Sequence, residues 1–214
     1  MEKAIFFDLD GTLTDSGEGI INCATLALSH FGLPIPSREA MRVFVGPPLR
    51  DTFVKFGVPE DRVEEAITVF RSRYVPIGKY ENTPYPGVTG LLANLRDGGY
   101  RMYVATSKPE TMAVDILTKF GLAEYFDEIC GATMDGSRDE KSQVIAYLLS
   151  KIGSRTQAVM VGDTAFDVIG AAAHGIPTVG VSWGYGSADD MKKAGAAAIA
   201  DSMDELCRIL TDFH

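Results

Sequence analysis

Two carboxylates, Asp8 and Asp10, stand two residues apart at the end of an apolar run at residues 4–7. The run predicts a strand buried on both faces, and residues two apart on a strand point to the same side. Gly11 follows directly and permits a tight turn, in which backbone N–H groups form a concavity for an anionic phosphoryl group. The pair therefore indicates phosphoryl chemistry, although by itself it also fits a plain Asp-Gly turn that ends a strand.

The elements that must position this pair alternate along the chain. Similar apolar runs occur at 101–105, 158–161 and 177–181, with weaker strand candidates at 128–132 and 197–200. Amphipathic segments of helical length lie between them, at 87–97, 109–120, 140–151, 165–174, 189–194 and 202–211. This order predicts a parallel α/β sheet, whose ligands bind beyond the carboxyl ends of the strands. Asp8, Thr106 and Asp163 follow three of these strands and are the places to expect chemistry.

One stretch breaks the alternation. Between residues 16 and 80 the patterns are helical, with predicted helices at 16–31, 37–44 and 61–75, and no convincing strand. The run at 82–87 contains two prolines and a glycine and is typical of a linker. We therefore expect a helical lobe at 16–81 inserted into an α/β core formed by 1–15 and 82–214.

Composition narrows the classes of function. Hydrophobic residues make up 46% and charged residues 23% of the 214 residues, as in ordinary globular proteins. The net charge of −9 disfavours nucleic acid, which binds clustered Lys and Arg. The sequence has three separated cysteines, no apolar stretch long enough to span a membrane and no signal-peptide pattern. It therefore predicts a cytoplasmic protein without disulfides or membrane contact.

Further motifs follow the first in a characteristic order. Thr106, Ser107 and Lys108 come after the second strong strand, Lys141 opens a later helix, and residues 162–167 read Gly-Asp-Thr-Ala-Phe-Asp. With the Asp-Leu-Asp-Gly-Thr-Leu motif at 8–13, this series resembles the haloacid dehalogenase-like phosphohydrolase superfamily over essentially the whole chain. It is most similar to the phosphoglycolate phosphatase-like branch. The resemblance implies a Rossmann-like core with a helical (C1-type) cap inserted after the first strand.

The resemblance also implies a mechanism. Asp8 would attack phosphorus to give an aspartyl-phosphate, and Asp10 would protonate the leaving oxygen and then deprotonate the attacking water. Mg²⁺ would be held by Asp8, the backbone carbonyl of Asp10 and Asp163, with Asp167 orienting the ion. The substrate would be a small phosphorylated metabolite such as 2-phosphoglycolate, a nucleoside monophosphate or a sugar phosphate, and the protein a monomer or homodimer.

The remaining site residues are also carried over from the family. Thr106 would bind a phosphoryl oxygen, Lys141 would neutralise charge on Asp8, and N–H groups near Gly11 and Ser107 would complete the phosphate cradle. Lys108 is a candidate substrate ligand, or a solvated residue at a helix start. The segment 44–50 resembles the family's specificity loop, where Arg50 would meet a second anionic group, or would be a solvated arginine in a turn.

Other functions stay open at this point. A phosphomutase of the β-phosphoglucomutase kind would use the same residues, and a non-catalytic receiver-like module also clusters aspartates around magnesium. Dehalogenase chemistry is disfavoured, because a halide leaving group does not require the acid Asp10. The Gly-Val-Ser-Trp-Gly run at 180–184 matches a serine hydrolase pattern, but no helix is predicted directly after it and His214 is the one histidine downstream.

Overall fold

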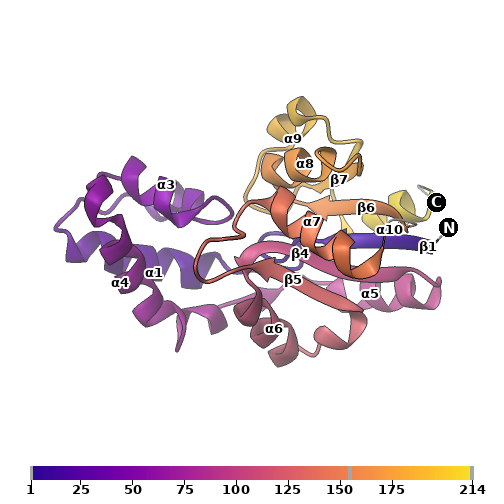
Figure 1. Cartoon of the computed structure of the whole chain (residues 1–214), viewed down its shortest axis with the longest axis horizontal. Helices are drawn as coiled ribbons and strands as arrows, with labels where there is room; N and C mark the ends of the chain where they lie inside the picture. The colour runs from indigo at the N-terminus through magenta and orange to yellow at the C-terminus, as the bar shows by residue number, and fades with distance from the viewer. Residues whose placement is uncertain (1, 154–155, 213–214) are drawn as a thin grey trace. The chain divides into compact units, whose positions relative to one another are not determined.

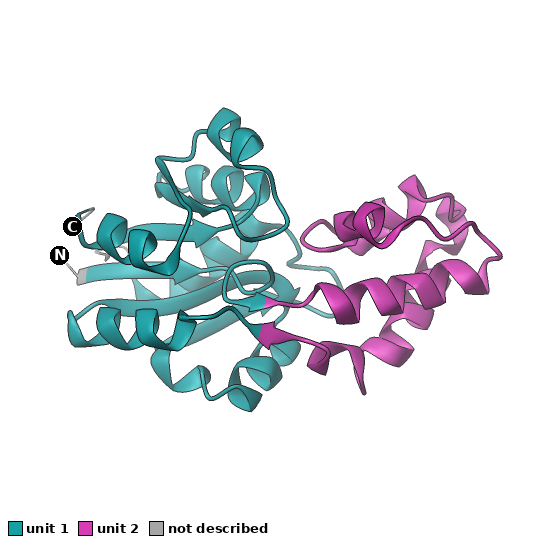
Figure 2. Cartoon of the chain, turned by 180° about the vertical axis from the view of Figure 1, so that it is seen from behind, with its two compact units in different colours: residues 1–14, 84–214 teal, residues 15–83 magenta. Residues whose placement is uncertain are grey.

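The computed structural model describes residues 2–153 and 156–212, which form two compact units. Unit 1 comprises residues 1–14 and 84–214, and unit 2 comprises residues 15–83 (Figure 2). The chain passes between the units at β2 (Thr14–Asp15) and β3 (Thr83–Pro84), two short strands that form their own small sheet. The sequence predicts one domain at 1–15 with 82–214 and a second at 16–81. That these two parts are separate domains stays a prediction.

Unit 1 is built on one parallel sheet. In the described residues this sheet has six strands in the order β5-β4-β1-β6-β7-β8 (Figure 1). Their bounds are β1 (Glu2–Phe7), β4 (Arg101–Pro109), β5 (Glu128–Ala132), β6 (Thr156–Gly162), β7 (Thr178–Val181) and β8 (Ala198–Ala200). Each of the six strands predicted from apolar runs is present, which confirms the parallel α/β core.

Both faces of the sheet are buried, which explains why its strands are continuously apolar. Ile5 and Phe7 of β1 pack on one face, whereas Ala4 and Phe6 pack on the other. Helices α5 (Val88–Asp97), α6 (Glu110–Lys119) and α10 (Met203–Asp212) cover the first face, and α7 (Lys141–Ile152) and α8 (Ala165–Ala172) cover the second (Figure 1). The short helix α9 (Ala188–Ala194) contacts α8. Burial on two sides is what parallel strands require.

Unit 2 is helical apart from the strand residues at its two ends. Its elements are α1 (Gly17–His30), α2 (Arg38–Met41), η1 (Arg42–Phe44), α3 (Leu49–Lys55), η2 (Glu60–Arg62), α4 (Val63–Tyr74) and η3 (Gly78–Tyr80). Its core contains an aromatic cluster in which Phe44 contacts Phe53 and Phe56, and Phe53 contacts Phe70. Among the described residues of the whole chain, no helix is long and apolar enough to cross a membrane.

Strand register brings the predicted site residues to one edge of the sheet. Phe7 at the end of β1 pairs with Val104 of β4 and with Val161 of β6. The residues that come next along these strands therefore lie at the same level, at the carboxyl edge of the sheet. Asp8, Thr106 and Asp163 follow these paired positions within one or two residues, so three distant parts of the chain meet there.

Candidate active site

Asp8 directly follows β1 and begins the tight turn that the Gly11 position predicts. The Leu9 carbonyl accepts N–H bonds from Leu13 at 2.9 Å and from Thr14 at 3.0 Å, and Gly11 has a φ of +85°. This left-handed backbone angle strongly favours glycine. The Gly11 N–H donates to the Thr14 carbonyl at 2.8 Å. The Gly11 N–H thus closes the turn, and the phosphate cradle of N–H groups near Gly11 stays a prediction.

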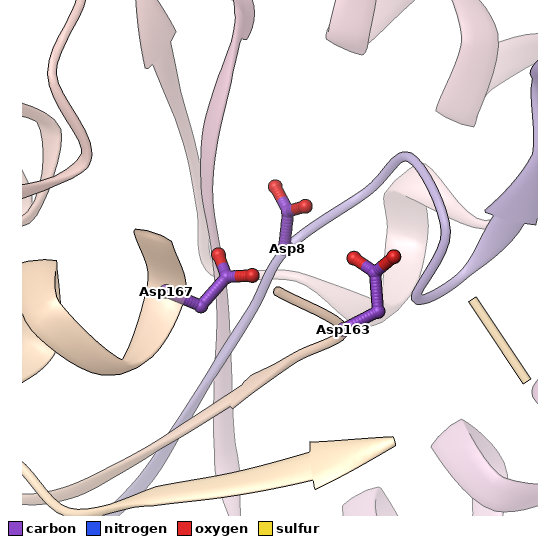
Figure 3. A group of neighbouring side chains, drawn as sticks. All are labelled: Asp8, Asp163 and Asp167. Carbon is purple, nitrogen blue, oxygen red and sulfur yellow. The ribbon is translucent and has the colours of Figure 1, made fainter. Parts of the chain in front are cut away.

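Three carboxylates meet at the carboxyl edge of the sheet. Oxygen atoms of Asp8, Asp163 and Asp167 lie within 4.8 Å of one another, and all three residues are buried. Figure 3 shows them coming from the segments after β1 and β6 and from α8, with their carboxyl groups pointing to the same side. Burial raises the pKa of Asp163 well above its usual range, and the negative charges of Asp167 and Asp8 raise it further.

Lys141 supplies positive charge to this cluster. Its Nζ atom donates to Oδ1 of Asp8 at 2.7 Å, to the Ala105 carbonyl at 2.9 Å and lies 2.8 Å from Oδ1 of Asp167. Burial alone would lower the pKa of Lys141, but the charges of Asp167 and Asp8 outweigh it, so the net shift is upward. The lysine therefore stays protonated although its side chain is only 5% exposed.

Asp167 is held by the first turn of its own helix. Its Oδ2 accepts from the backbone N–H of Thr164 at 3.0 Å and from the Thr164 hydroxyl at 2.9 Å, as part of a capping box. Burial raises the pKa of Asp167, and the positive charge of Lys141 only partly opposes that rise. A Cβ on Gly162 would lie 2.3 Å from Cγ of Asp167, so the glycine of this motif makes room for the carboxylate.

Asp10 has its own lysine partner. The Nζ atom of Lys108 lies 2.5 Å from Oδ2 of Asp10, and the Lys108 side chain is only 4% exposed. Its alternative interpretation as a solvated residue is therefore wrong. Thr106 is buried and its hydroxyl accepts the Lys108 N–H at 3.2 Å, while Ser107 between them is partly buried. The pairing of β4 with β5 shifts register between Thr106 and Pro109, and such an irregularity re-aims side chains beside a site.

This arrangement can be compared with known proteins. The family model described as haloacid dehalogenase-like hydrolase matches residues 5–181. The chain belongs to this hydrolase family. Proteins named phosphoglycolate phosphatase are among its relatives over nearly the whole chain, which confirms the branch that the motifs predicted.

Individual members of the haloacid dehalogenase-like family are similar over most of their length. Tyrosine-protein kinase PtkA of Mycobacterium tuberculosis is 45% identical over 95% of this chain and 71% of its own sequence. A 5′-nucleotidase of Pseudomonas aeruginosa is 38% identical over 88% of this chain and 86% of its own. The crystal structure of a predicted phosphatase from Clostridium acetobutylicum superposes with a TM-score of 0.95 at 38% identity, covering 99% of both chains. The chain is accordingly a phosphatase of this family.

One part of this phosphatase's site was missed in the sequence. The Tyr185 N–H donates to Oδ2 of Asp163 at 2.7 Å, and the Trp183 indole N–H donates to the Thr12 carbonyl at 3.2 Å. A Cβ on Gly184 would lie 2.3 Å from Oδ2 of Asp163. The Gly184-Tyr185-Gly186 run belongs to none of the motifs that predicted the site. Its position directly after a predicted strand was the signal that pointed to the site.

Arg50 requires a correction. The sequence placed it in a loop at 44–50, whereas Leu49 and Arg50 form the first turn of α3, which begins after Pro48. This helix was not predicted, because Pro47 and Pro48 suggested a longer loop; proline, however, is well tolerated just before a helix. Arg50 is exposed and pairs with Glu64 inside unit 2. Its proposed contact with substrate stays a prediction.

Proposed function

We propose that this phosphatase is a Mg²⁺-dependent phosphomonoesterase that forms a phosphoryl-enzyme on Asp8. The observation that carries the proposal is the buried meeting of Asp8, Asp163 and Asp167 within 4.8 Å, with Lys141 bonded to Asp8. Burial of several charged groups costs folding free energy, and such clusters are typical of functional sites.

The donor set suits magnesium. The three buried carboxylates supply only oxygen ligands, and Mg²⁺ prefers oxygen ligands. Burial and, after it, the negative charges of Asp167 and Asp8 raise the pKa of Asp163, and the positive charge of Lys141 opposes that rise only in part. Asp8, the carbonyl of Asp10 and Asp163 would hold the ion, with Asp167 beside it. When bound, the ion would draw negative charge from the phosphoryl oxygens.

Asp8 is proposed as the nucleophile. One of its oxygens forms a bond to phosphorus while the bond from phosphorus to the ester oxygen breaks, and water later cleaves the phosphoryl-aspartate to release phosphate. Lys141, 2.7 Å from Oδ1 of Asp8, orients the carboxylate and lowers the repulsion between two anions. The Thr106 hydroxyl, at the carboxyl edge of β4, would donate to a phosphoryl oxygen.

Asp10 is proposed to move the proton. It gives a proton to the leaving oxygen in the first half-reaction and takes one from water in the second. Lys108, 2.5 Å from Oδ2 of Asp10, holds this carboxyl group in place before substrate arrives. A substrate anion would be a further partner for Lys108, which is the basis of its predicted role in binding.

Substrate choice is proposed to reside in unit 2, the predicted cap, where Arg50 is the candidate contact for a second anionic group. The name of the Pseudomonas relative favours a nucleoside monophosphate among the small metabolites considered. We further expect a cytoplasmic monomer or homodimer. A panel of phosphorylated metabolites with Mg²⁺, read as released phosphate, tests the class. EDTA-sensitive hydrolysis of p-nitrophenyl phosphate is expected, and its absence at all metal concentrations would contradict the proposal.

A second candidate follows from the relative named tyrosine-protein kinase, which is 45% identical. The same phosphoryl-aspartate could pass its phosphoryl group to a tyrosine hydroxyl in place of water. A phosphomutase would pass it to a sugar hydroxyl. Product analysis with ³²P-labelled donors separates the three: free phosphate supports the phosphatase, labelled tyrosine the kinase, and an isomerised sugar phosphate the mutase.

A further inference from the structure

The loop that leads to Lys141 is closed by Arg138. This loop connects β5 to α7, and Arg138 lies three residues before the site lysine. The Thr133 N–H donates to the Arg138 carbonyl at 2.9 Å, and the Arg138 N–H donates to the Thr133 hydroxyl at 3.1 Å. The start of α7 is therefore tied to the end of β5 through this residue.

The Arg138 side chain reaches back over β5. Its Nε donates to the Gly131 carbonyl at 2.9 Å, its Nη2 lies 3.2 Å from Oε2 of Glu110, and its guanidinium lies 3.7 Å from the centre of the Tyr147 ring. Only 20% of the side chain is exposed. An arginine bound to a carbonyl, a carboxylate and an aromatic ring has little freedom to move. Lysine cannot replace it, because an ammonium group lacks the planar, forked set of N–H donors of a guanidinium.

Glu110 connects this arginine to the other site lysine. It is the first residue of α6, two residues after Lys108, and its Oε2 also accepts the Gly131 N–H at 3.2 Å. A Cβ on Gly131 would lie 2.5 Å from the Lys108 carbonyl, so the two strands approach closely here. The pair of Glu110 and Arg138 thus joins the segment that carries Lys108 to the segment that carries Lys141.

We propose that Glu110 and Arg138 are positioning residues, which set the two site lysines against Asp8 and Asp10. This rests on the proposed phosphatase mechanism. Lys141 must lie between two carboxylates, at 2.7 Å from Asp8 and 2.8 Å from Asp167, and Lys108 lies 2.5 Å from Asp10. Displacement of a charged group by about 1 Å at such a site can cost about 100-fold in rate. Neither residue touches the reacting atoms in this scheme.

Turnover of p-nitrophenyl phosphate with Mg²⁺ is the first test. Arg138→Met should lower kcat by about 10- to 100-fold, with KM and the melting temperature changed much less. Lys151→Met is the matched control, because Lys151 also joins α7 to β5, through Glu128 at 2.9 Å, and also lies over the Tyr147 ring. An equal effect of both variants, or no effect of Arg138→Met, would overturn the proposal.

A double-mutant cycle separates positioning from a general structural role. If Arg138 acts through Lys141, then adding Arg138→Met to Lys141→Met should change kcat less than about twofold. The parallel cycle pairs Glu110→Gln with Lys108→Met. Multiplicative losses in both cycles would show that the pair acts independently of the lysines and would refute the inference.

A spectroscopic arm does not depend on turnover. With ¹³C at the lysine Cε, the signals of Lys141 and Lys108 are assigned by Lys→Arg variants. Arg138→Met should shift both signals, whereas Lys151→Met should leave them unchanged. Signals that do not move in Arg138→Met would refute the proposal. If the wild-type protein released no phosphate while the signals moved as expected, the proposed function would fail and the positioning role would stand.

Discussion

The Nζ atom of Lys141 lies 2.7 Å from Oδ1 of Asp8, although 133 residues separate them in the chain. The same ammonium lies 2.8 Å from Oδ1 of Asp167. One buried positive charge thus serves two carboxylates, and the third, Asp163, adds further negative charge.

Lys141→Met should destabilise the metal-free protein and lower kcat strongly, to a small but measurable residual rate. Removal of one partner from a buried ion pair costs about 3–5 kcal/mol, because the remaining charge is left uncompensated. Chemical denaturation with EDTA measures the loss. Mg²⁺ should restore part of the stability but not the turnover; a variant as stable as wild type in EDTA would contradict the charge balance described here.

Asp8→Asn should keep the fold and lose more than about 1000-fold in kcat, as removal of a nucleophile implies. Circular dichroism checks the fold and phosphate release checks turnover. Asp127→Asn is a suitable control, because Asp127 pairs with Arg101 at the opposite, amino end of β5. Near-normal turnover of Asp8→Asn would remove the phosphoryl-enzyme from the mechanism.

The pKa of Asp163 predicts a dependence of stability on pH. Its native pKa is raised above its unfolded value, so between the two values the native state binds more protons than the unfolded state. The free energy of unfolding in EDTA should therefore fall as the pH rises through the native pKa. Mg²⁺ binds the carboxylate form, so its stabilising effect should grow over the same range.

Asp163→Asn checks that pH dependence. This variant should flatten the pH profile in EDTA, be more stable than wild type at pH 7 without metal, and lose the increase in melting temperature on addition of Mg²⁺. A wild-type profile that rises with pH in EDTA would show that the carboxylate is stabilised in the native state, contrary to the prediction.

Gly184→Ala should weaken Mg²⁺ binding by about 10- to 100-fold, as displacement of a ligand's supporting shell does. The new Cβ would lie 2.3 Å from Oδ2 of Asp163, the atom that accepts the Tyr185 N–H. Isothermal titration with Mg²⁺ measures the effect. Gly90→Ala is the control, because no atom lies within 4 Å of its added Cβ, and it should leave the affinity unchanged.

The three cysteines should differ in reactivity. Burial raises the pKa of the Cys130 thiol to about 11 and also raises that of Cys23, whereas Cys207 is only partly buried. Because the thiolate is the reactive form, a thiol reagent at pH 8 should modify about one cysteine per native chain quickly. Cys207→Ser should remove that fast phase; a fast phase that survives would mean that a buried thiol is accessible.

Much of the fold followed from local patterns. The apolar runs predicted all six strands of the sheet, and helical periodicity predicted α1 and α4 to α10 within about three residues, because burial on both faces of a parallel sheet leaves a clear sequence pattern. Helix α3 was missed because two prolines precede it. The short strands β2 and β3 were missed because two residues carry no periodicity.

The sequence by itself determined which reactive groups the site contains. These are Asp8 and Asp10 at their spacing of two residues, the glycine turn after them, and the acidic motif that ends at Asp167. Only the tertiary structure decided which side chains meet. The pairing of Lys108 with Asp10, the backbone support of Asp163 by Tyr185 and the link from Glu110 to Arg138 all depend on strand order. The first and the last of these contacts also lie beside the register shift in β4. These contacts join residues 22 to 98 positions apart, a distance over which local propensity carries no information.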